Sequence, residues 1–85
     1  MALIEIDVTE EITYNIVYGN EYLFKNVVII QNLGDCDIHV SMKEFESKIQ
    51  GMSFSKKDGI IFDNATNIFV RQDKGPSQYI YLNTK

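Results

Sequence analysis

Four consecutive β-branched residues at positions 27–30 constrain the fold of this chain more than any other stretch. Such a run favours a strand buried on both faces, because branched side chains pack well on a pleated surface. We predict that strand over residues 27–32, and the alternating segment 38–42 predicts a second one. The intervening residues 33–37 contain glycine and aspartate, which suit the backbone of short turns. Residues 26–42 therefore predict a β-hairpin at the centre of the domain.

The rest of the chain predicts further short strands separated by polar turns. Residues 3–8 and 12–18 alternate between apolar and polar side chains, which indicates half-buried strands. Residues 43–50 contain the best helix formers, and they predict one short helical turn at most. The remaining extended segments are 22–24, 52–55, 60–62, 68–72 and 78–83, with turns at 57–59, 63–67 and 73–77.

Regular strand spacing of about eight to ten residues is typical of a sandwich or barrel. The predicted fold is therefore all-β: a small antiparallel, jelly-roll-like β-sandwich with about seven or eight short strands. With 85 residues the chain is long enough for one domain and not for two. We expect a single domain over residues 1–85, in which residues 1–24 form an N-terminal arm or an added strand.

One cysteine, Cys36, and one histidine, His39, leave the chain without an internal disulfide or a Cys/His zinc site. Domains this small usually need a disulfide, a metal or another chain to be stable. The segments 60–62, 68–70 and 79–82 are apolar on both faces, whereas strands of a lone antiparallel sandwich have one polar face. We therefore expect a second apolar surface that meets another chain. The alternative is that loops and the N-terminal segment cover it.

Aromatic side chains are the expected centre of that interface, since tyrosine suits sites with one end buried and the other wet. The candidate interface residues are Tyr14, Tyr18, Tyr22, Phe24, Phe69, Tyr79 and Tyr81. Two other uses remain open for the same residues, namely packing in the core and stacking on a sugar.

The charge balance argues against several classes of partner. Twelve acidic and eight basic residues give a net charge of −4, which disfavours direct binding to phosphate backbones. No apolar run is long enough to span a membrane, and the N-terminal residues lack the basic and apolar regions of a signal peptide. We expect synthesis in a reducing cytoplasm, where a free cysteine is unremarkable.

Catalytic or metal-binding chemistry is not expected either. No basic cluster flanks Cys36 to lower its pKa, and residues three apart on a strand face opposite ways, which separates Cys36 from His39. Turn formation alone accounts for the acidic residues of the predicted turns, which are Asp35, Asp37, Asp63 and Asp73. We predict no enzyme activity, no catalytic residue, no metal and no cofactor.

Residues 26–83 resemble small β-sandwich proteins of tailed bacteriophage particles. The resemblance lies in VVIIQNLGDCDIHVSM and in GMSFSKKDGIIFDNATNIFVRQDKGPSQYIYLN, where a valine-rich strand ends in Gln-Asn before a small turn. An Ile-aromatic-Val-Arg strand and a short closing strand follow. The segment 43–50 looks like an insertion into this pattern.

The resemblance implies a non-enzymatic structural protein of the virion: a capsid decoration, head-fibre, neck or tail component. It implies a homo-oligomer, a trimer or a ring, in contact with other virion proteins, and it places the N-terminal 24 residues outside the match. The alternative function is a small carbohydrate-binding module whose partner is a glycan on the host surface. A small enzyme is the least favoured hypothesis.

Overall fold

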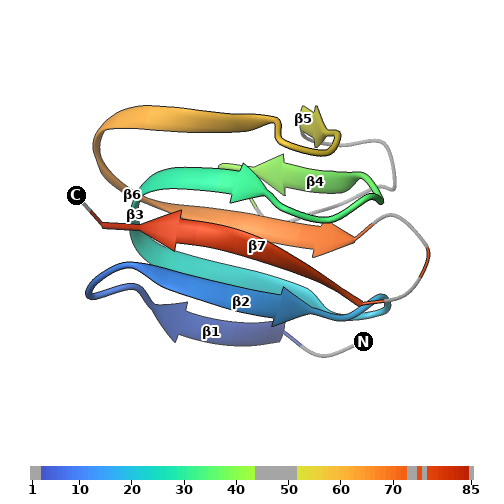
Figure 1. The fold of residues 1–85 in the computed structure, drawn as a ribbon. Helices are drawn as coiled ribbons and strands as arrows, with labels where there is room; N and C mark the ends of the chain where they lie inside the picture. Colours follow the sequence, from blue (N-terminus) through green and yellow to red (C-terminus); the bar gives the residue numbers. More distant parts are fainter. Residues whose placement is uncertain (1–2, 44–51, 73–74, 76, 85) are drawn as a thin grey trace.

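The computed structural model describes residues 3–43, 52–72, 75 and 77–84, which form an all-β domain (Figure 1). Their seven strands are β1 (Leu3–Asp7), β2 (Ile12–Ile16), β3 (Glu21–Asn32), β4 (Ile38–Ser41), β5 (Met52–Phe54), β6 (Gly59–Gln72) and β7 (Gln78–Asn83). One continuous sheet has the order β2-β7-β3-β6-β4-β5, and β1 pairs with β3. Every pair is antiparallel except β1 with β3. The predicted all-β antiparallel class is confirmed, while the helical turn predicted near 43–50 lies, from residue 44 on, outside the described part.

Two long strands form the frame of the sheet. Strand β3 has 12 residues and β6 has 14, and both curve sharply near their middle (Figure 1). The register of the β3–β6 pair shifts on either side of Val27, and Asn26 has a φ of 64°. Such bulges bend a strand and increase its twist. The seven strands agree with the predicted number, but β3 joins the predicted segments 22–24 and 27–32, and β6 joins 60–62 and 68–72.

The bend gives each half of β3 its own neighbours. Residues 21–25 pair with β1, and residues 29–32 pair with β7. The sheet curls in this way around one core, and whether it should be classed as a jelly-roll-like sandwich stays a prediction. The buried apolar residues form a single cluster: Val8, Ile16, Tyr22, Phe24, Val27, Ile30, Ile38, Val40, Phe54, Ile68, Val70, Ile80 and Leu82.

The predicted central hairpin is wrong. Strands β3 and β4 are not neighbours, because β6 lies between them and pairs with both. The reason is the length of β6, whose second half offers β4 an apolar partner in register, with Val70 opposite Val40. The turn predicted at 63–67 is also wrong, because these residues do not interrupt the strand. They lie within β6, where it curves.

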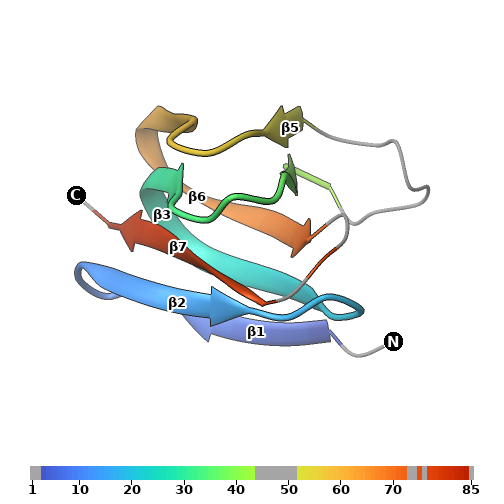
Figure 2. The same ribbon diagram turned by 45° about the vertical axis from the view of Figure 1, so that its right-hand side comes forward.

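The N-terminal segment is part of the sheet of its own chain. Strand β1 pairs with β3, and β2 pairs with β7, so neither is held out as an arm. Figures 1 and 2 both draw β1 directly below β2, although β1 pairs with β3 and β2 pairs with β7. Whether residues 1–24 also act as an arm or added strand toward another chain stays a prediction.

Candidate functional site

The side chains of β6, β3, β7 and β2 that point away from the core form one open surface, here called the outer face. Its rows follow from the strand register, in which Ile29 lies opposite Ile61 and Gln31 lies opposite Gly59 and Tyr81. The neighbouring residues Ile30, Ile80 and Leu82 point inward and are buried. The outer face comprises Thr13, Asn15, Ile29, Gln31, Gly59, Ile61, Tyr79, Tyr81 and Asn83.

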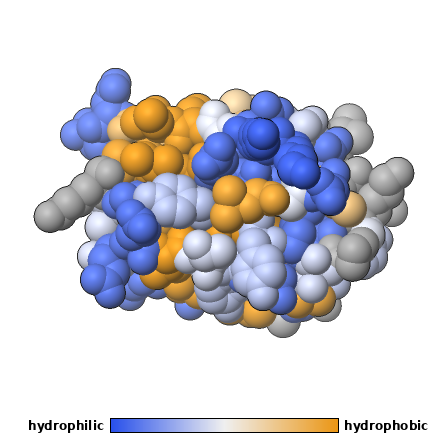
Figure 3. Space-filling view, viewed as in Figure 1, coloured by the Kyte–Doolittle hydropathy of each residue, from blue (hydrophilic) through white to orange (hydrophobic). Residues whose placement is uncertain are grey.

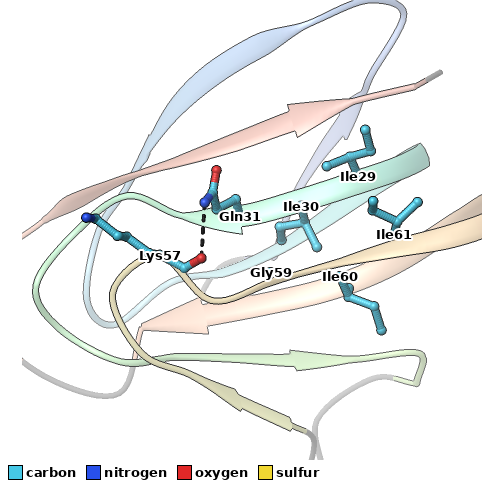
Figure 4. A pocket seen from close by; sticks show the side chains of 7 residues that line it. All are labelled: Ile29, Ile30, Gln31, Lys57, Gly59, Ile60 and Ile61. Atoms are coloured by element: carbon cyan, nitrogen blue, oxygen red, sulfur yellow. Dashed lines mark hydrogen bonds between the residues drawn. The ribbon is translucent and has the colours of Figure 1, made fainter.

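A shallow hollow of about 550 Å³ lies at the β3–β6 end of the outer face (Figure 4). Gly59 lies opposite Gln31 and is one of the residues that line the hollow. A Cβ at this glycine would lie 2.5 Å from the carbonyl oxygen of Ile30, so the close approach of β3 and β6 requires glycine here. The Nε2 of Gln31 donates to the carbonyl oxygen of Lys57 at 3.0 Å and closes one side of the hollow.

The other side of the hollow is apolar. Figure 4 shows the side chains of Ile29 and Ile61 together on the same side of the sheet, and Ile60 pointing the opposite way. Ile61 is 73% exposed, the largest exposure among the exposed large apolar residues of the described part. Figure 3 shows an apolar area over the β6 end of this face. Ile61 and Ile29 therefore form the apolar side of the hollow.

Two of the predicted interface tyrosines belong to the outer face. Tyr79 is 55% exposed, and Tyr81 is half-buried. The hydroxyl of Tyr81 donates to the Oε2 of Glu11 at 3.1 Å and accepts from the Nδ2 of Asn83 at 3.0 Å. Hydrogen bonds on both sides therefore fix the orientation of this ring.

The other predicted interface residues do not join them. Tyr22 and Phe24 are 2% and 0% exposed, so they belong to the core, which corrects their assignment to an interface. Tyr14 packs edge-on against both rings at centroid distances of 5.8 and 5.6 Å. Tyr18 is exposed next to the β2–β3 turn, and Phe69 is half-buried on β6. The structure therefore brings together only Tyr79 and Tyr81 from the predicted set on the outer face.

A buried amide pair supports the loop beside this face, and the sequence analysis missed it. Asn32 donates through Nδ2 to the carbonyl oxygens of Cys36 and Phe54, both at 2.9 Å, and its Oδ1 accepts from the Gly34 N–H at 2.9 Å. The Nε2 of Gln78 donates to the same Oδ1 at 3.2 Å and to Cys36 O at 2.7 Å. The only signal in the sequence was an amide at the end of each apolar strand.

The ionic contacts lie away from the hollow. Lys25 Nζ contacts Glu5 Oε1 at 2.9 Å across the β1–β3 pair, and this hydrogen bond, with the attraction between the two charges, raises the pKa of Lys25. Lys56 pairs with Asp35 at 2.9 Å. Among residues 3–43, 52–72, 75 and 77–84 no cluster of three His, Cys, Asp or Glu side chains could hold a metal ion, and no helix there is long and apolar enough to cross a membrane.

Comparison with protein-family models, curated proteins and solved structures finds no match to this chain. The functional argument therefore rests on the outer face and on the sequence pattern.

Proposed function

We propose that this chain is a non-enzymatic assembly protein that acts through protein–protein contacts of its outer face. The observation that supports it most is the exposed Ile61, which lies opposite the half-buried Ile29 beside the hollow at Gly59. Burying apolar surface contributes roughly 25 cal/mol per Å², and Ile61 loses this stabilisation as long as it faces water. A partner that covers Ile61 and Ile29 would bury this apolar surface, and binding would gain the corresponding free energy.

The place of assembly that we propose is a tailed bacteriophage particle, as a capsid decoration, head-fibre, neck or tail component. The support is the strand rhythm of residues 26–83, which resembles small structural proteins of such particles. In this proposal the chain is made in the host cytoplasm and ends in the virion, where it contacts itself and other virion proteins.

Quantitative mass spectrometry of purified particles from the source of this sequence tests the proposal. The chain should be present at a fixed copy number relative to the major capsid protein, and it should resist removal by washing. Absence from the particles, or a copy number that varies between preparations, would reject the virion assignment.

A carbohydrate-binding module is the second candidate, and the exposed ring of Tyr79 favours it. Sugar rings stack on exposed aromatics while side-chain amides and hydroxyls bind their hydroxyl groups. Asn15 lies opposite Tyr79 in the β2–β7 register, and Thr13 lies opposite Tyr81. A glycan array with the folded chain should then give hits that Tyr79→Ala abolishes and Ile61→Ala keeps. No hits would remove this candidate.

A further inference from the structure

We propose that two copies of this chain pair edge to edge along residues 59–63 of β6, around a two-fold axis at Ile61. The inference rests on the proposed assembly function and names the first partner as a second copy of the chain. The two sheets would continue into each other as antiparallel neighbours.

The first part of β6 is an open edge in the described part of the chain. Residues 59–61 pair with residues 29–31 of β3 on one side, and no described strand pairs with them on the other. Strand β4 reaches β6 only at residues 69–72. Unpaired N–H and C=O groups along an edge are a template for another strand.

This edge lacks the features that usually protect an edge strand from pairing. Strand β1 carries two acidic side chains, Glu5 and Asp7, and β5 has only three residues. Charge and shortness are common means of blocking edge association. Residues 59–62 are Gly-Ile-Ile-Phe, without a charge or a proline, and the one charge of the proposed contact, Asp63, lies at its end, so this part of the edge is open to pairing.

The register centred on Ile61 matches the apolar residues of both faces. Ile61 lies opposite its own copy, so Ile29 and Ile61 of the two chains form one apolar row across the outer face. On the inner face Ile60 lies opposite Phe62, and both already pack against the core at its margin. Pairing therefore covers the most exposed apolar residue and extends the two cores toward each other.

Charge complementarity selects the same register. Asp63 lies opposite Gly59 of the second copy, next to the hollow that Gly59 and Lys57 both line. In this register the Asp63 carboxylate would approach Lys57 of the second copy, whose side chain would turn toward it, and the symmetry would produce two such ion pairs. A register centred on Phe62 would place Asp63 opposite Ile61 instead. Since each chain has a net charge of −4, local attraction of this kind is needed to bring two copies together.

A disulfide placed on the axis tests the register. In a Cys36→Ser background, Ile61→Cys puts two thiols opposite each other, with Cα atoms roughly 4.5–5.5 Å apart, which suits a disulfide. Asn64→Cys is the matched control, because its two copies would lie roughly 20 Å apart at about 3.3 Å per residue. Under mild oxidation we expect a covalent dimer of the Ile61→Cys variant at micromolar concentration and none of the control. Equal cross-linking of both variants, or of neither, overturns the proposal.

Charge exchange gives a second readout. Asp63→Lys and Lys57→Asp should each raise the dimer Kd about tenfold by sedimentation velocity, and the double variant should restore it, as expected for two rim ion pairs. Aspartate tolerates the left-handed backbone of Lys57, whose φ is 70°. If the dimer Kd of both single variants and of the double variant equals that of the parent, the proposed register is wrong.

Particles that contain the chain while the Ile61→Cys variant stays monomeric would reject the edge contact alone. A selective cross-link with no chain in particles would reject the virion assignment alone.

Discussion

Replacing Asn32 with aspartate tests the buried amide network that holds the 33–37 loop. The side chain is 0% exposed and makes four hydrogen bonds, two donated and two accepted. Asn32→Asp keeps the shape and the accepting oxygen, and it removes both donors. The carboxylate then faces the carbonyl oxygens of Cys36 and Phe54 at the distance where an amide donated.

The expected loss of unfolding free energy comes from these two carbonyl groups, which lose their hydrogen-bond donors. A buried polar group left without its partner costs about 1–3 kcal/mol, so two carbonyls cost about 2–6 kcal/mol. Burial without a cationic partner also raises the pKa of the new carboxyl group, since the charged form is disfavoured. We expect a loss of about 4 kcal/mol in unfolding free energy at pH 8, against a total of about 5–15 kcal/mol for domains in general.

The loss should shrink as the pH falls. An acid whose pKa is raised in the folded state binds its proton there first, so stability is regained between that raised pKa and the ordinary aspartate pKa of about 3.9. The protonated acid also donates one of the two missing hydrogen bonds. Near pH 4.5 we expect the deficit relative to the parent to be about 2 kcal/mol.

Urea unfolding of parent and variant at several pH values measures this difference. Far-UV circular dichroism and tyrosine fluorescence are suitable probes, because the chain has five tyrosines and no tryptophan. Asn15→Asp, the same change at an exposed position of β2, is the control and should stay within about 0.5 kcal/mol of the parent. A deficit below 1 kcal/mol at pH 8, or one that grows on acidification, would refute the reasoning.

Three further changes probe other parts of the domain. Gly59→Ala should lower the thermal midpoint in a melting experiment, since the new Cβ would lie 2.5 Å from a β3 carbonyl oxygen. Phe24→Ala should cost about 3–5 kcal/mol in urea unfolding, whereas Tyr18→Ala, at a position 58% exposed, should cost less than about 0.5 kcal/mol. Glu5→Gln should lower the pKa of Lys25 toward 10.5 in an NMR titration, because the Glu5 hydrogen bond raises it. The stabilisation from this pair is present below pH 10.5 and is lost as the pH rises through the raised pKa, a loss that the variant should not show.

Local pattern located most strands, and it did not reveal their neighbours. Alternation at residues 3–8, 12–18 and 78–83 reports which side chains face the core, and strands were found at all three. Pairing depends on residues far apart in the chain, such as the match between Val40 and Val70. The shortest turn suggested a hairpin, but the second half of β6 provided a better neighbour for β4.

The candidate site was predictable only in outline. Apolar residues on both faces of 60–62 predicted a second apolar surface, and Ile61 is indeed exposed. The hollow could not be predicted, since it depends on the register that places Gly59 opposite Gln31. Tyrosine type alone could not separate Tyr22 from Tyr79, because burial depends on which strand half lies over the core.

The place of β7 between β2 and β3 has a consequence for the folding pathway. In the described part of the chain β2 pairs with β7 alone, and these two strands lie at opposite ends of the sequence. While the ribosome is still making the chain, β2 therefore waits without a partner until residues 78–83 emerge. Sheets built from such distant contacts fold in about milliseconds to seconds, and unpaired strand edges favour aggregation during that time, so the nascent domain is most exposed to it before β7 inserts.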